Sequence, residues 1–322
     1  MGILRFIIRR LIFMIFLVLG VTIIIFFMIN AIGDPIEILL AERPGITQEV
    51  IDNIKSYYKL DRSLTEQYSS WLWNVLHLDF GTSIIYNQSV RNMLVTWGWE
   101  TIKIQVPAIL ISLLLAILFA SIASTRQYTK TDFGVMGTAL LGRSMPGFFT
   151  GILLILVFSY WLGIFPSYGA YSTRNPLMGS VLLDSLWHMT LPVMMLAYFN
   201  TATLTLLIRS SMVDVLRQDF IIAARASGLK NSRVVYGHAL KNAIIPALTY
   251  LAILFGLMLG TAPVTETVFT WPGLGFLYIS AIQQLDYPVI MGITLIITIM
   301  LVLANLLTDI AYVFIDPRIR LE

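Results

Sequence analysis

The chain has 322 residues, of which 57% are hydrophobic and only 12% are charged, and its net charge is +3. Soluble domains carry about 25% charged residues, so most of this surface is expected to face lipid. The absence of cysteine excludes disulfides and thiolate chemistry, and three scattered histidines are too few for a histidine metal cluster. The basic residues do not gather into one patch, so no nucleic-acid partner is expected.

Six apolar runs are long enough to cross a hydrocarbon core of about 30 Å as helices. They cover approximately residues 11–30, 102–124, 136–162, 189–208, 243–263 and 288–315. The first run has a longer apolar core than a secretory signal, so it is expected to be a retained span. The sequence therefore predicts an all-α integral membrane protein with six transmembrane helices.

The distribution of Lys and Arg predicts how these spans are oriented, because cytoplasmic loops are enriched in both. Loop 163–188 has only Arg174, and loop 264–287 has neither Lys nor Arg. Thirteen of the 21 basic residues lie at the termini, after the second run or between the fourth and fifth runs: Arg5, Arg9, Arg10, Arg126, Lys130, Arg209, Arg217, Arg225, Lys230, Arg233, Lys241, Arg318 and Arg320. Both termini and the stretch 209–242 are therefore predicted to be cytoplasmic.

Residues 31–99 form a large segment that is predicted to lie outside the cell. Ser63 and Glu66 have the spacing of a capping box before a helix, and Thr47 can cap another short helix. The segment is either a plain helical cap on the outer mouth or a docking surface for an extracellular partner. The predicted domains are 1–30, with the first span; 31–99, the helical outer segment; and 100–322, a core of five spans that includes the stretch 209–242.

Sequence signatures of enzymes are missing. The chain has no G-x-x-x-x-G-K-[ST], no H-E-x-x-H and no G-x-S-x-G. It is therefore not expected to be an enzyme or to bind a nucleotide through a P-loop of its own. A membrane enzyme and an ATP-independent channel or secondary carrier are two classes to consider, and uptake that depends on ATP would exclude the second.

The stretch FIIAARASGLKNSRVVYGHALKNAIIP, residues 220–246, is basic and rich in alanine. It is too short and too polar to cross a membrane. Gly228 suits a helix end in the left-handed conformation, and Ala223, Ala224 and Ala226 allow another backbone to approach closely. The stretch can lie on anionic lipid or fit a socket on a cytoplasmic protein. Its small apolar residues favour the protein partner, because lipid contact favours large anchors.

Polar and aromatic residues near the predicted spans are candidates for lining a path across the membrane. A group in the loop before the last run can form an outer gate over a translocation path, or a plain hydrophobic plug between helix ends: Thr265, Glu266, Phe269, Trp271 and Pro272. Asn200, with Thr201, Thr203 and Thr205, can line a water-filled path or hold helices together.

The basic stretch resembles the coupling loop of ABC-importer permeases, whose pattern is E-A-A-x3-G-x9-I-x-L-P. Ala223, Ala224 and Gly228 match this pattern. Three positions depart from it, where the pattern has Glu, Ile and Pro: Ile222, His238 and Lys241. These departures are typical of the dipeptide/oligopeptide branch of the family, which shows A-R-A-x-G-L and then H-A-L-[RK]-N-A-x-I-P.

The resemblance extends over nearly the whole chain. Further motifs of that branch occur in the same order: LDRSLTEQYSSWL at 60–72 with DFGTS at 79–83, SMPGFFTGILLILVFSYWLGIFPSYG at 144–169, RSSMVDVLRQDF at 209–220, ETVFTWPGLG at 266–275 with DYPVIMG at 286–292, and DPRIR at 316–320. The chain thus resembles the B-type permease subunit of a peptide-class ABC importer.

This resemblance implies a type I ABC-importer architecture in the plasma membrane. The implied partners are a second, related permease, two cytoplasmic ATPase subunits and an extracellular binding protein. The chain itself is expected to bind no cofactor, with ATP and Mg on the ATPase subunits. Peptides are the expected cargo, with oligosaccharides or nickel chelates as alternatives. The residues implied in coupling to the ATPases are Ile222, Ala223, Ala224, Arg225, Ala226, Gly228, Leu229 and His238.

Overall fold

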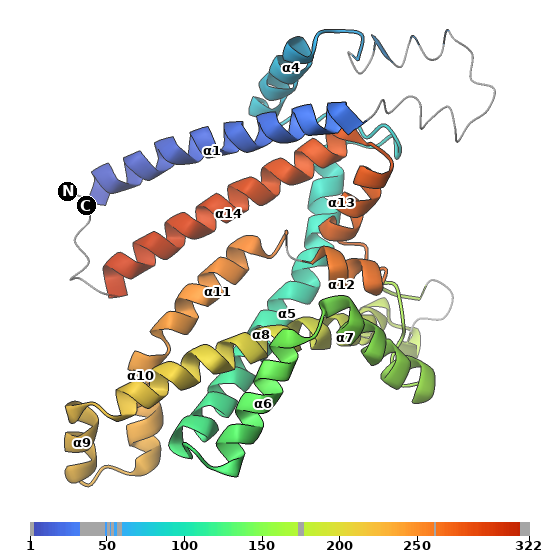
Figure 1. Cartoon of the computed structure of the whole chain (residues 1–322). Helices are drawn as coiled ribbons and strands as arrows, with labels where there is room; N and C mark the ends of the chain where they lie inside the picture. Colours follow the sequence, from blue (N-terminus) through green and yellow to red (C-terminus); the bar gives the residue numbers. More distant parts are fainter. Residues whose placement is uncertain are drawn as a thin grey trace.

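Figure 1 shows the computed structural model of the chain, which is built from helices. The structure describes residues 3–32, 49, 52, 55, 56, 60–172, 177–260 and 262–315. Within these ranges it contains only one isolated β-bridge, between Thr82 and Ser89, so the all-α prediction is confirmed. Most of the helix predicted after Thr47, and the whole motif at 316–320, lie outside the described residues.

Four helices are long and apolar enough to cross a membrane singly. They are α1 (Ile3–Ile32), α5 (Val90–Thr125), α8 (Val181–Leu216) and α14 (Tyr287–Ile315). The number of candidate spans rises to six when each of two bent helix pairs is taken as one span.

The first bent pair replaces the single helix predicted over 136–162. Helix α6 (Lys130–Ser144) meets α7 (Gly147–Leu154), which continues into the π-helical turn η1 (Ile155–Trp161), at an angle of 106°. The break occurs at Met145 and Pro146. Met145 is extended, as the residue before a proline tends to be, and Pro146 has no N–H for a helical hydrogen bond.

The second bent pair contains the predicted fifth run. The π-helical turn η3 (Arg233–Ala239) and α10 (Leu240–Ala243) meet α11 (Ile245–Leu257) at 53°. The run was predicted to continue to residue 263, but α11 ends at Leu257. Pro263 instead opens a separate short helix, as proline does well in a first helical turn.

The remaining elements are short: α4 (Leu64–Leu76), η2 (Leu177–Gly179), α9 (Asp219–Ala226), α12 (Pro263–Val268) and α13 (Leu274–Gln283). Two long helices extend beyond the apolar runs from which they were predicted. Helix α5 begins at Val90, ten residues before the domain boundary placed at residue 100, because Val90, Met93 and Leu94 continue its buried face. Helix α8 likewise continues to Leu216, into the stretch predicted as a loop from residue 209.

The two largest buried clusters join most of the long helices. The α5–α8 cluster joins α5, α8, α9, η3, α10 and α11, and its fully buried members include Ala116, Ile208 and Ile221. The α1–α14 cluster joins α1, the start of α5, α13 and α14. In Figure 1, α1 and α14 lie side by side in opposite directions at the top of the view, whereas α9 and α10 lie at the lower left.

Candidate functional site

Helix α9 carries most of the predicted coupling residues, and a turn at Gly228 fixes its end. Gly228 has a φ of +77°, which confirms the left-handed conformation predicted for it. Its N–H donates to the carbonyl of Arg225 over 3.0 Å, and the N–H of Leu229 donates to the carbonyl of Ala224 over 3.4 Å. This pair of bonds is the Schellman arrangement, which satisfies carbonyls that a helix end leaves free.

Two side chains of α9, Ile221 and the half-buried Ala224, pack against the bundle. Ile221 is fully buried in the α5–α8 cluster, and it is the one buried residue of this helix. The remaining residues of the helix are largely exposed: Ile222 is 58% exposed, and Ala223, Arg225 and Ala226 are exposed as well. The helix therefore presents the small residues Ala223 and Ala226 away from the bundle, while Ile221 and Ala224 hold it in position.

The element after the turn packs beside α9. Val234 and Val235 of η3 are buried in the same cluster as Ile221, and His238 on η3 is half-buried. Tyr236 is 50% exposed. The structure thus brings the eight predicted coupling residues into one region made of α9, its closing turn and η3.

The base of this region is tied to α6 by an ion pair. The Arg209 guanidinium donates to both carboxylate oxygens of Asp132, over 3.1 and 2.6 Å. Asp132 also accepts the backbone N–H of Tyr128 over 3.0 Å, and its side chain is almost fully buried. A second hydrogen bond follows near the end of α8, where the Arg217 guanidinium donates to the side-chain oxygen of Gln127 over 3.1 Å. Helix α8 therefore holds the start of α6 just before the chain enters α9.

The predicted gate residues lie on a hairpin formed by α12, the turn 269–273 and α13, hereafter the α12–α13 hairpin. Thr265, Glu266, Phe269 and Trp271 are each at most 2% exposed, and Pro272 is half-buried. Asn200 lies half-buried on α8, next to Phe199, which packs against the cluster that contains Phe269.

The aromatic residues of this hairpin fill space between helices of the same chain. Phe269 packs with Leu191 and Met195 of α8. Trp271 packs among residues of α5 and α8, and its indole N–H donates to the carbonyl of Glu100 over 2.9 Å. Such burial is what a hydrophobic plug requires, and the role of these residues as a gate stays a prediction.

Two buried carboxylates lie on the predicted outer side, outside the candidate spans. Burial raises the pKa of Glu266 to about 7, although hydrogen bonds from Thr101, Phe276 and Gly275 act against the rise. Burial also raises the pKa of Asp286. The Asp286 carboxylate accepts the Ser83 hydroxyl and the N–H groups of Ile84 and Ile85, over 2.5, 3.2 and 3.4 Å. Asp286 thereby attaches the turn after α4 to the start of α14.

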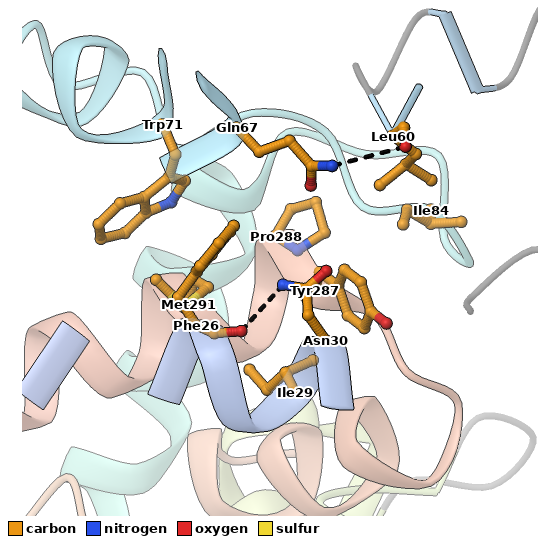
Figure 2. A pocket seen from close by; sticks show the side chains of 10 residues that line it. All are labelled: Phe26, Ile29, Asn30, Leu60, Gln67, Trp71, Ile84, Tyr287, Pro288 and Met291. Carbon is orange, nitrogen blue, oxygen red and sulfur yellow. Dashed lines mark hydrogen bonds between the residues drawn. The ribbon is translucent and has the colours of Figure 1, made fainter. Parts of the chain in front are cut away.

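The described part of the outer segment is folded onto the spans. Ser63 caps α4 by accepting the N–H of Glu66, as the sequence predicts, and the Tyr68 hydroxyl lies 2.9 Å from that of Thr22 on α1. Figure 2 shows a pocket of about 100 Å³ below α4, lined by Phe26, Ile29, Asn30, Leu60, Gln67, Trp71, Ile84, Tyr287, Pro288 and Met291. Helix α4 therefore covers the ends of α1 and α14, as a cap would, and docking of an extracellular partner there stays a prediction.

Several residues that shape these sites were not identified from the sequence. Ile221 could have been found, because it is an apolar residue on the side of α9 opposite the exposed alanines. Thr101 and Gly273 could not, because their importance depends on a contact between segments about 170 positions apart, as in the bond from the Leu274 N–H to Thr101. On the same helix as Thr101, Lys103 forms a local ion pair with Glu100 at 2.6 Å.

Comparison with known proteins matches most of the chain to two family models. Residues 108–321 match the binding-protein-dependent transport system inner membrane component, and residues 3–86 match the N-terminal region of the same kind of membrane component. The oligopeptide transport system permease protein AppB of Bacillus subtilis is 37% identical over 317 residues, 98% of this chain and 99% of that protein. The dipeptide transport system permease protein DppB of Escherichia coli K12 is 36% identical over 336 residues, with the same coverage.

A solved structure supports the fold independently of these sequences. An amino acid ABC transporter, crystallised with histidines, matches with a TM-score of 0.51 at 17% identity, over 68% of this chain and 92% of the other. Its fold is that of an ABC transporter permease, and the apolar helices described above make the present chain a multi-pass protein of the plasma membrane. The chain belongs to the family of binding-protein-dependent transport system inner membrane components.

Proposed function

We propose that this chain is one of two related permease subunits in an ATP-driven importer of peptides. The observation that carries the proposal is the geometry of α9, which is held by the single buried residue Ile221 and closed by Gly228. A helix of this kind, with small residues on its free face, suits insertion into a groove on another protein. Two cytoplasmic ATPase subunits that hold ATP and Mg would supply that groove and the energy.

The proposed topology has six spans, with both termini and α9 on the cytoplasmic side. The asymmetry of Lys and Arg supports it. The bent pairs α6–α7 and α10–α11 each count as one span in this arrangement. An extracellular binding protein would then dock at the side of α4 and the α12–α13 hairpin.

Peptides are the proposed cargo because relatives of nearly the same length are named as oligopeptide and dipeptide permeases. Energy-dependent uptake of a labelled di- or tetrapeptide by cells that express the complete system tests this directly. Uptake that persists when ATP is depleted would contradict the ATP-driven mechanism and favour a carrier.

The docking role of α9 has its own test. Ala223→Trp places a large side chain on the exposed face of α9, so we expect the chain to insert normally while recovery of ATPase subunits with an affinity-tagged copy falls at least about tenfold, a loss of roughly 1.4 kcal/mol in association. Lys130→Trp, on the exposed start of α6, is the matched control and is expected to keep its partners. Equal recovery of ATPases with both variants would refute the docking role.

A further inference from the structure

The carboxylate of Glu266 is surrounded by donors from two other parts of the chain. The Thr101 hydroxyl of α5 donates to Oε1 over 2.7 Å, and the N–H of Phe276 donates to Oε2 over 2.9 Å. The N–H of Gly275 is a further donor to this carboxylate. Glu266 itself is fully buried, so these bonds replace all of its contact with water.

Together, Glu266 and Thr101 cap helix α13. Gly273 precedes the helix without a side chain that could cap it. The Thr101 hydroxyl accepts the N–H of Leu274 over 2.8 Å, and Glu266 accepts those of the next two residues. The first N–H groups of a helix need such acceptors, and a negative charge is favourable at this end of the helix dipole. The cap of α13 is thus supplied by α12 and α5.

The glycines of the turn leave room for this carboxylate. A Cβ on Gly273 would collide with the Glu266 carboxylate, which supplies the three nearest atoms it would meet. Gly273 has a φ of −102°, so its backbone itself tolerates alanine. Gly275 differs, since a Cβ there would come within 2.6 Å of the Pro263 backbone.

The hairpin reaches α5 at two neighbouring residues. Trp271 donates to the carbonyl of Glu100, and Glu266 accepts from Thr101. Helix α5 then continues unbroken to Thr125 and contributes Ile109, Ala116 and Ala120 to the cluster that holds Ile221 of α9. One helix of 36 residues, about 54 Å long, thus connects the α12–α13 hairpin to the base of the coupling helix.

We infer that Glu266 and Thr101 are positioning residues that fix the α12–α13 hairpin to α5, so that the hairpin moves together with the helix that supports α9. In this role Glu266 is a buried cap and does not touch cargo, which differs from its expected place in a gate. The mechanical part of the inference rests on the proposed function, whereas the bond between carboxylate and hairpin does not.

A double-mutant cycle tests the contact itself. Because the three atoms nearest to a Gly273 Cβ all belong to the Glu266 carboxylate, Gly273→Ala should lower the thermal midpoint of the detergent-solubilised chain by roughly 5 °C, and the same change on a Glu266→Ala background should lower it by less than about 1 °C. An equal fall in thermal midpoint on the two backgrounds would show that residue 273 does not contact the Glu266 carboxylate.

Thiol labelling gives a second readout that does not depend on the stability of the variants. The chain has no cysteine, so Thr265→Cys introduces a single buried thiol on α12. Glu266→Ala and Thr101→Val should raise its labelling rate at least about tenfold, since the hairpin is released more often. Glu266→Gln keeps an acceptor for the N–H groups and should label as slowly as the parent. Labelling that stays slow in Glu266→Ala would also overturn the inference.

Transport assays of the assembled complex test the mechanical part. Thr101→Val and Glu266→Ala should keep their ATPase partners while peptide uptake falls at least about tenfold, and Glu266→Gln should restore uptake. Undiminished uptake in Glu266→Ala, with the thiol label showing a released hairpin, would overturn the positioning role. If the unmodified chain binds no ATPase and imports no peptide, the proposed function fails and the double-mutant cycle still decides the contact.

Discussion

At the scale of single residues, neighbouring isoleucines on α9 have opposite environments. Ile221 is fully buried in the α5–α8 cluster, whereas Ile222 is 58% exposed. The first therefore determines where the helix lies, and the second is available to a partner. Adjacent residues of the same type can separate these two roles because the helix turns by about 100° per residue.

Replacing Ile221 and replacing Ile222 should have different effects on stability and on partner binding. Ile221→Ala removes a buried side chain and should cost about 2–5 kcal/mol of the free energy of unfolding. Ile222→Ala should change stability by less than about 0.5 kcal/mol but should weaken ATPase association. Thermal unfolding of the chain alone, together with partner recovery, measures both. A similar loss of stability in the two variants would show that α9 is not seated as described.

Glu266 makes stability depend on pH. Its folded-state pKa of about 7 lies above the ordinary value of 4.5. The folded chain therefore binds more protons than the unfolded chain between these values, and stability falls as the pH rises through this window. The difference corresponds to roughly 3 kcal/mol, at about 1.4 kcal/mol per pKa unit.

We expect the thermal midpoint to fall from pH 5 to pH 8 in the parent chain and to fall less in Glu266→Gln. Asp286, whose pKa is also raised by burial, adds a dependence of the same sign to both proteins. The difference between them therefore isolates Glu266. Parallel pH profiles for the two proteins would contradict the burial of an ionisable carboxyl at this site.

At the scale of elements, α6 is attached to α8 by Asp132 and Arg209. Asp132 is 3% exposed at its side chain and Arg209 is 18% exposed, so either partner left alone would be an uncompensated charge with little access to water. Breaking a buried pair by removing one partner typically costs about 3–5 kcal/mol, whereas replacing both with apolar residues costs far less.

Arg209→Met should therefore destabilise the chain by about 3–5 kcal/mol, and the double variant Asp132→Leu, Arg209→Met should recover most of that loss. Unfolding midpoints of the two variants and the parent give the comparison. An equally large loss of stability in the double variant would show that the ion pair stabilises the fold by more than the mutual compensation of its two charges.

At the scale of the whole molecule, the apolar runs of the sequence predicted where the long helices lie, because bilayer thickness constrains their length. They could not predict that α5 begins at Val90, since the added turns are not apolar throughout, and their buried face packs against α13 and α14. The break at Pro146 was visible as a proline, but its angle of 106° depends on how α7 packs against α12.

The candidate sites also contain features that the sequence predicts and features that it does not. The turn at Gly228 was predictable, because a left-handed helix end favours glycine locally. The burial of Glu266 was not, because it results from Thr101, Gly273 and Gly275 meeting across distant segments. Local backbone chemistry is thus readable from a sequence alone, whereas the environment of a charged side chain requires the tertiary packing.

The length of α8 bears on whether a partner of α9 would contact it in water or at the lipid surface. Its 36 residues extend about 54 Å, and the hydrocarbon core is only about 30 Å thick. In the proposed topology, the last turns of α8, from Arg209 to Leu216, extend beyond the hydrocarbon core on the cytoplasmic side, so α9, which follows them directly, lies on the aqueous side of the membrane surface. Contacts made there form in water among Arg225, Lys230 and Arg233, so added salt should weaken them, whereas bilayer composition should matter little.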